Sequence, residues 1–269
     1  MNATRSVTLL SVLAFGYVFL YLPIAILIVY SFNDSQLVTV WSHASLRWYF
    51  ALLKNTQLQE AAWLSLRIAV VSATIAAVLG TAAAFALQRL RPFAGSRSYE
   101  ALVMMPLVIP EVLIGLSLLL LFVVLGATIG WPGTRGATTV TLAHATFSMA
   151  YATVVVRARL SQLDPALEEA AAILGAKPWR TFLRVTLPLL MPAIVAAWLL
   201  AFTLSLDDVV VASFVTGPGA STLPIVVYSS VRLGVSPQIN ALATLIVVFV
   251  ACLILAATFM SRAGAKTKL

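Results

Sequence analysis

Six stretches of this chain are long and apolar enough to cross a lipid bilayer as helices. They cover residues 8–31, 61–88, 99–126, 138–156, 191–213 and 237–260. A hydrocarbon core about 30 Å thick takes roughly 20 apolar residues as helix, and only 10% of the 269 residues are charged. Because lipid leaves no hydrogen-bond partners for open strand edges, the sequence predicts an all-α integral membrane protein with six transmembrane helices.

Lys and Arg residues are distributed unevenly between the two sides that these spans define. Twelve of the 17 fall on one side: Arg5, Arg89, Arg91, Arg97, Arg157, Arg159, Lys177, Arg180, Arg184, Arg262, Lys266 and Lys268. Basic residues beside membrane helices favour the cytoplasmic side. We therefore predict cytoplasmic termini and a single transmembrane domain over residues 1–269. The net charge of +8 is spread over loops, which argues against a nucleic-acid partner.

The chain lacks the residue patterns of several kinds of chemical site. The lone Cys252 excludes an internal disulfide, and neither His43 nor His144 has a Cys or paired acid at metal-ligand spacing. No G-x-x-x-x-G-K-[ST] phosphate loop occurs. We expect no catalytic residue, no metal and no cofactor in this chain, so any ATP hydrolysis would need a partner.

Two neighbouring carboxylates interrupt the fifth apolar stretch, in LSLDDVVVASF at residues 204–214. An ionised acid in hydrocarbon is costly and usually faces a cavity, a pathway or a partner charge. Successive helical residues differ by about 100°, so a continuous helix would place one stripe of residues together: Trp198, Ala201, Phe202, Ser205, Asp208 and Ala212. This favours Asp208 for a pathway. Asp207 could serve it if the helix is rotated, and a purely structural acid pair remains the alternative.

A third acid, Glu111, follows Pro106 and Pro110 in the third apolar stretch. Proline removes a backbone donor and bends a helix, so Glu111 either lines a pathway or satisfies a freed backbone group. None of the six stretches has a basic residue in its middle, and the acids therefore predict a cationic cargo. The candidate pathway residues are Asp208, Asp207, Glu111, Trp198, Phe202, Ser205 and Tyr151.

The long cytoplasmic segment at residues 157–192 predicts two short helices. Pro165 after Asp164 is typical of a helix start, and Gly175 is a natural stop. Pro178 then opens a second amphipathic piece. The simplest alternative is an interfacial helix lying on the lipid surface.

This segment resembles the permeases of ABC importers. Their motif, E-A-A-x-x-x-G followed by a hydrophobic residue, any residue and L-P, is matched by Glu169, Ala170, Ala171, Gly175, Val185, Leu187 and Pro188. Val185 stands where the family more often has isoleucine. The stretches WYFALLKN, MPLVIPEVLIGLSLLLLF, LAHATF, AFTLSLDDVVVASFVTGPGASTLP and SSVRLGVSPQINALATL are similar to permeases of polyamine importers. They look most like the second permease subunits of putrescine importers.

The resemblance implies a type I ABC importer permease fold (MetI-like), in a multi-pass protein of the bacterial inner membrane. Residues 157–190 would form the loop that couples to the ATPase, with contacts from Glu168, Glu169, Ala170, Ala171, Leu174, Gly175, Ala176 and Trp179. The implied partners are a paralogous permease, two ATPase subunits that bind ATP and Mg, and a periplasmic polyamine-binding protein. The cargo would be putrescine or another small cation such as spermidine.

Other interpretations stay open. The segment at residues 32–60 could dock an external partner or form an aromatic interfacial belt, and residues 216–224 could be a docking loop or a plain turn. A secondary transporter would use the three acids as proton or sodium carriers, but no inverted repeat is visible. An intramembrane hydrolase would need catalytic groups that the spacing does not supply.

Overall fold

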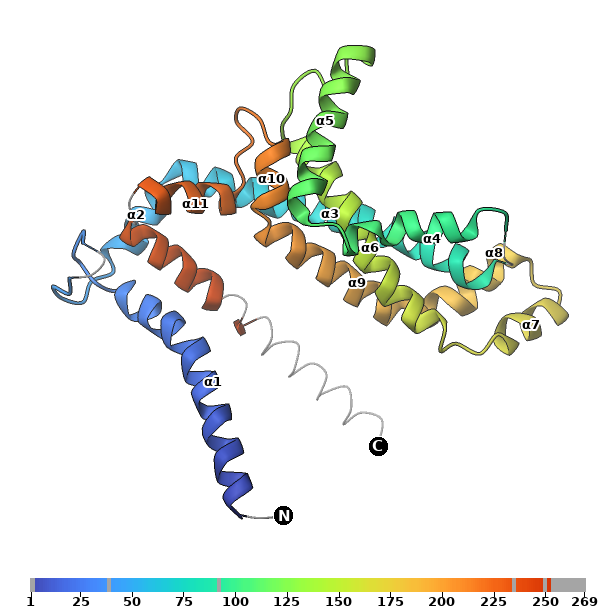
Figure 1. Ribbon diagram of the computed structural model, residues 1–269, viewed down its shortest axis with the longest axis horizontal. Helices are drawn as coiled ribbons and strands as arrows, with labels where there is room; N and C mark the ends of the chain where they lie inside the picture. Colours follow the sequence, from blue (N-terminus) through green and yellow to red (C-terminus); the bar gives the residue numbers. More distant parts are fainter. Residues whose placement is uncertain (1–2, 38–39, 91–92, 234–235, 249–250, 253–269) are drawn as a thin grey trace. The chain divides into compact units, whose positions relative to one another are not determined.

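The computed structural model describes residues 3–37, 40–90, 93–233, 236–248 and 251–252. Within this part the regular elements are helices, and one isolated bridge joins Asn33 and Ala44 (Figure 1). Contacts group the chain into two units, one of Met1–Gln59 with Val227–Leu269 and one of Glu60–Val226. The single transmembrane domain over residues 1–269 stays a prediction.

The first unit contains one long helix of 28 residues, shorter helical segments and an ordered polar turn. Its elements are α1 (Ala3–Tyr30), α2 (Arg47–Lys54), the start of α3 (Thr56–Arg89), most of α11 (Leu223–Leu233) and the helix Pro237–Val248. The turn after α1 closes around buried Asn33, whose side-chain amide donates to the Val40 carbonyl at 2.7 Å. The Trp48 indole of α2 donates to the Asn33 carbonyl at 2.7 Å. The aromatic helix α2 is thus folded against its own loop.

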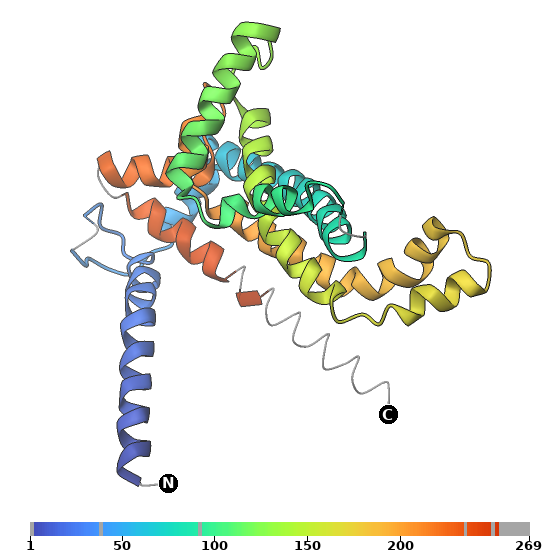
Figure 2. The same cartoon turned by 45° about the vertical axis from the view of Figure 1, so that its right-hand side comes forward.

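The second unit is a bundle around α6. Its elements are the rest of α3, α4 (Ser96–Met104), the 3-10 turn η1 (Met105–Leu107), α5 (Glu111–Ile129), α6 (Ala137–Leu160), α7 (Ala166–Ile173), α8 (Pro178–Thr181), the π-helix η2 (Phe182–Thr186), α9 (Leu187–Asp207) and α10 (Val210–Val215). In both views α6 runs beside α9 (Figure 2). A Cβ added to Gly80 of α3 would lie 2.7 Å from the Ala152 Cβ of α6. The two backbones therefore approach as closely as small residues permit, as is common between membrane helices.

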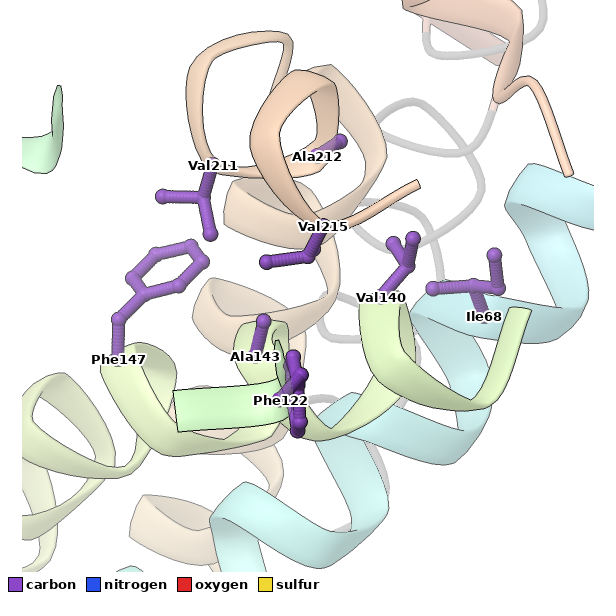
Figure 3. Close-up of a cluster of buried hydrophobic side chains, with 8 residues drawn as sticks. All are labelled: Ile68, Phe122, Val140, Ala143, Phe147, Val211, Ala212 and Val215. Carbon is purple, nitrogen blue, oxygen red and sulfur yellow. The ribbon is translucent and has the colours of Figure 1, made fainter. Parts of the chain in front are cut away.

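A buried apolar cluster fixes the short helix α10 against α5 and α6 (Figure 3). Its members are Ile68, Phe122, Val140, Ala143, Phe147, Val211, Ala212 and Val215. Close by, a Cβ on Gly115 of α5 would lie 2.7 Å from the Phe214 ring. Because α10 is only six residues long, this packing, rather than its own hydrogen bonds, has to hold it in place.

Five helices in the described residues are long and apolar enough to span a membrane. They are Leu9–Tyr30, Thr56–Arg89, Glu111–Ile129, Ala137–Leu160 and Pro178–Asp207. They account for the first five predicted stretches. Of the sixth, the described part is the helix Pro237–Val248, and the remainder to residue 260 lies largely outside the described residues, as does the basic tail. Six spans and cytoplasmic termini stay predictions.

Two of the predicted spans are interrupted as helices, one as its prolines predicted and one against expectation. The stretch 99–126 is divided into α4, η1 and α5, because Pro106 and Pro110 cannot donate to a helical ladder. This confirms the expected interruption beside Glu111. The stretch 191–213 ends as a helix at Asp207, and Asp208 takes an extended conformation with ψ of 127° before α10 begins. The local residue pattern did not predict this second break, because residues 204–214 contain neither glycine nor proline.

Candidate functional site

Asp208 sits at the break between α9 and α10 and replaces the missing helical bonds. Its carboxylate accepts the backbone N–H of Val211 at 3.2 Å and of Ala212 at 2.7 Å. Helix ends leave N–H groups that an Asp side chain commonly satisfies. The break is therefore made by Asp208 itself, which explains why α10 restarts in an apolar run with no glycine or proline.

A buried polar chain extends from Asp208 across three helices. One Asp208 oxygen lies 3.1 Å from His144 Nε2 on α6, and His144 Nδ1 lies 2.7 Å from the Ser205 hydroxyl on α9. Ser72 of α3 donates to that hydroxyl at 3.0 Å. The side chain of Asp208 is 4% exposed and that of His144 is fully buried. Every member of this chain is hydrogen-bonded, as buried polar groups require.

The expected helical stripe that pointed Asp208 toward a pathway is wrong, because it presupposed a continuous helix through Ala212. Asp208 and Ser205 do lie together, but they face His144 inside the unit. The residue pattern alone led us to consider His144 only as a metal ligand and to count no basic residue in the middle of the six stretches. A histidine in the apolar stretch 138–156 was the available signal, since a polar side chain there needs a partner.

The other candidate pathway residues lie at different places. Asp207, the last residue of α9, is exposed, as is Glu111 in the first turn of α5. Trp198 and Phe202 stack with ring centroids 5.3 Å apart, and the Trp198 indole donates to Thr74 of α3 at 3.0 Å. Tyr151 is partly buried against the cluster of Figure 3. The structure thus pairs Trp198 with Phe202, whereas Glu111 and Tyr151 stand on other elements.

Between α6 and α9 the chain forms one separate short helix, α7, as predicted. The predicted second short helix is not separate, because α8 and η2 continue into α9 and make Pro178–Asp207 one helix of 30 residues. The Asp164 carboxylate accepts the Ala166 N–H at 2.9 Å and begins α7. Gly175 has φ of +79°, and the Ala176 N–H bonds back to the Ala171 carbonyl at 3.0 Å, which ends it. This is the hydrogen bonding of a glycine C-cap. Pro178 then opens α8.

The tip of this segment exposes large apolar side chains. Ile173 is 86% exposed and Leu174 is 87% exposed, while Leu167 and Trp179 are also exposed. No residue of α7 is buried. Contiguous exposed apolar groups mark sites that contact another protein or a membrane surface.

The two glutamates of α7 differ in their surroundings. Glu169 is exposed, together with Ala170. Glu168 accepts the Thr186 hydroxyl at 2.9 Å and lies 3.4 Å from Arg89 Nε. Only Glu169 is therefore presented to the outside of the unit.

An apolar groove of about 830 Å³ runs between α3 and the segment from α8 into α9. Aromatic side chains form much of its wall, from Phe85, Trp179, Phe182 and Trp198. None of the described residues that line it carries a charge. A cation there would meet aromatic faces but no counter-charge.

Loops at the far end of this unit pack against one another. A Cβ on Gly217 would overlap the Arg135 carbonyl oxygen, and the Arg135 guanidinium donates to the Phe214 carbonyl at 3.3 Å. Thr139 donates to the Val215 carbonyl at 2.7 Å. The segment 216–224 is thus anchored within the unit, and a docking role for it stays a prediction.

A family model and known relatives both match most of this chain. The family model of the binding-protein-dependent transport system inner membrane component matches residues 76–266. The putrescine transport system permease protein PotI of Escherichia coli (strain K12) is 55% identical over 246 residues, which cover 91% of this chain and 88% of that protein. The spermidine/putrescine transport system permease protein PotC of the same strain is 41% identical over 251 residues, covering 93% and 92%.

Solved transporter structures share the fold. A chain of a bacterial ABC transporter that imports alginate superposes with a TM-score of 0.76 at 19% identity, covering 96% of this chain and 95% of that one. A chain of the MetNI methionine ABC transporter gives a TM-score of 0.61 at 19% identity, covering 79% and 95%. At this identity the likeness concerns the fold alone.

Proposed function

The chain belongs to the family of binding-protein-dependent transport system inner membrane components, and from this premise we propose that it is a permease subunit of an ATP-driven polyamine importer. The observation that carries the proposal is the 55% identity to the putrescine permease PotI over 91% of the chain. The lower identity of 41% to the spermidine/putrescine permease PotC makes putrescine the preferred cargo over spermidine. The chain is a transport component, and ATP hydrolysis belongs to a partner.

The proposed assembly lies in a bacterial inner membrane. This chain pairs with a paralogous permease, and an ATPase dimer holds ATP and Mg on the cytoplasmic side. A periplasmic binding protein delivers the polyamine. A solved alginate transporter in complex with its ligand-bound periplasmic protein supports this kind of arrangement. The distribution of basic residues supports cytoplasmic termini and a cytoplasmic position for α7.

The apolar tip of α7 is the proposed contact with the ATPase. Ile173 and Leu174 would insert into an apolar pocket, with Trp179 beside them. Ala170 and Ala171 allow close backbone approach, and exposed Glu169 can pair with a basic group at the rim. Hot spots of interfaces are buried apolar anchors surrounded by a polar rim, which is the arrangement that this tip offers.

The proposed cation pathway uses the exposed acids rather than the buried one. Asp208 is engaged by His144 and two backbone N–H groups, so it supports the break in the helix. Asp207 stands beside it and is exposed, which makes it the better carboxylate for an ammonium group. Trp198 and Phe202 are candidate aromatic faces for the passing cation, and Glu111 is a second candidate acid.

Reconstitution tests the proposed function. The complete complex of both permeases, the ATPase and the binding protein would be placed in proteoliposomes with labelled putrescine. We expect uptake that requires ATP and the binding protein and is competed by unlabelled putrescine more strongly than by spermidine. Uptake without ATP would favour a secondary transporter, and ATP-driven uptake of a neutral or anionic solute only would overturn the cationic cargo.

A further inference from the structure

Arg89 is the last residue of α3. It contacts two parts of the exposed loop, the connection between α6 and α7 and the helix α7 itself. Its side chain is 13% exposed, and its Nη2 donates to the Leu163 carbonyl at 3.0 Å, in the connection between α6 and α7. Its Nε lies 3.4 Å from Glu168 on α7. One cation thus holds the connection and the helix that follows it. A nearly buried arginine needs such partners, because its charge is costly to remove from water.

The carboxylate of Glu168 brings a third element to the same point. The oxygen that faces Arg89 also accepts the Thr186 hydroxyl at 2.9 Å. Thr186 is buried and is the last residue of the π-helix η2, which leads into α9. The ends of α3, α7 and η2 therefore meet at one oxygen atom. We call Arg89, Glu168 and Thr186 the clasp.

One helical turn away from the clasp, an aromatic contact joins α3 to η2. Phe85 of α3 packs edge-on against Phe182, the first residue of η2, with ring centroids 5.3 Å apart. π-helical turns occur frequently at functional sites, where they widen a helix locally. Here η2 lies between two fastenings to α3, one aromatic and one through the clasp. The end of the loop at η2 is therefore held by α3 as well as by α9, into which η2 continues.

Without the clasp, α7 would be loosely attached. None of its residues is buried, and Gly175 follows it with a left-handed conformation. A force on the exposed tip could then bend the loop without moving the bundle. The same helix α3 carries Ser72, which bonds to Ser205 beside the break at Asp208. Arg89 and Ser72 are about 26 Å apart along the helix at 1.5 Å per residue.

We propose that Arg89 is a positioning residue that makes α3 move with the coupling loop, so that ATPase-driven displacement of α7 reaches the acid-bearing break through α3 as well as through α9. This inference rests on the proposed function. Glu168 accordingly acts inside the permease, and Glu169 is the glutamate that meets the ATPase. Packed elements with two discrete arrangements can transmit such motion, whereas a hinged loop cannot.

The transport test compares Arg89→Ala with Arg159→Ala in the reconstituted complex. Arg159 is an exposed arginine near the end of α6 and serves as the matched control. We expect Arg89→Ala to retain the ATPase on purification and to hydrolyse ATP, while putrescine moved per ATP falls about tenfold, the usual scale of coupling between sites. Arg159→Ala keeps the normal ratio. The exchange of Arg89→Glu with Glu168→Arg recovers part of the ratio that either single change loses.

Two results would overturn the clasp. In one, Arg89→Ala loses bound ATPase, hydrolysis and uptake in equal proportion, so that the residue only maintains the fold. In the other, the ratio of putrescine to ATP is unchanged. Failure of the proposed function is recognised separately, because the unmodified complex would then show no ATP-dependent putrescine uptake.

A spectroscopic test does not depend on the cargo. Spin labels at Ala166→Cys on α7 and Val78→Cys on α3, with Cys252→Ser, report the distance between the loop and α3 within one unit. We expect a narrow distribution that is the same with and without ATP, and a broad one after Arg89→Ala. An equally narrow distribution in Arg89→Ala would contradict the clasp, whatever the cargo proves to be.

Discussion

The second unit contains two regions where a helix is interrupted. One region buries polar side chains, and the other exposes apolar side chains. Between α9 and α10 the chain breaks at an acid, and the polar groups are buried and satisfied within the chain. Between α7 and α8 it breaks at a glycine, and apolar side chains are left in the open. A buried polar site with complete hydrogen bonding needs no ligand to explain it. An exposed apolar tip needs a cover, either another protein or the lipid surface, so the two regions separate internal packing from external contact.

The largest expected effect is at the exposed tip. Leu174→Asp places a charge where an apolar pocket of the ATPase should receive a leucine, and we expect affinity for the ATPase to fall about 100-fold. The measurement is retention of the ATPase on the purified permease pair. Gln162→Asp, at another exposed position of the same segment, should bind normally. Normal retention by Leu174→Asp would mean that the tip faces lipid or solvent.

The buried break should respond in stability rather than in partner binding. Asp208→Leu removes the acceptor of two backbone N–H groups and leaves His144 without its partner. We expect a loss of about 3 kcal/mol in the free energy of unfolding, measured as thermal unfolding in detergent. Asp208→Asn keeps one acceptor oxygen and should lose less. A fully stable Asp208→Leu that no longer transports would place this carboxylate in the pathway after all.

The helix that joins the two regions can be tested at its closest contact. Gly80→Ala inserts a methyl 2.7 Å from the Ala152 Cβ and 3.0 Å from the Thr153 nitrogen. Because backbone atoms cannot yield as a flexible side chain does, we expect a loss of about 1–3 kcal/mol. Gly16→Ala, in α1 with nothing within 4 Å of the added Cβ, should not be destabilised. If Gly80→Ala unfolds like the unmodified chain, α3 and α6 are less tightly packed than described.

The comparison also explains what the sequence could predict. The loop follows from neighbours in sequence: Asp164 with Pro165 starts α7, Gly175 stops it and Pro178 restarts the chain. The broken third span likewise follows from its prolines. At the break the Asp208 carboxylate binds two local N–H groups and also His144, 64 residues away, and no periodicity contains such a pairing. The prediction assumed a continuous helix across Asp208. The helix ends there because the Asp208 carboxylate binds the N–H groups that follow.

The smallest expected effect separates the neighbouring acids. Asp207→Asn removes one negative charge from an exposed position at the end of α9. Since an exposed ion pair contributes up to about 1 kcal/mol, we expect the KM for putrescine uptake to rise about fivefold, with unchanged thermal unfolding. Glu111→Gln, on another helix, is the matched comparison, and a non-additive double variant would mean that both acids act on the same cation. If Asp207→Asn alters unfolding and leaves KM unchanged, Asp207 belongs with Asp208 to the architecture of the break, and the pathway must take its charges from elsewhere in the complex.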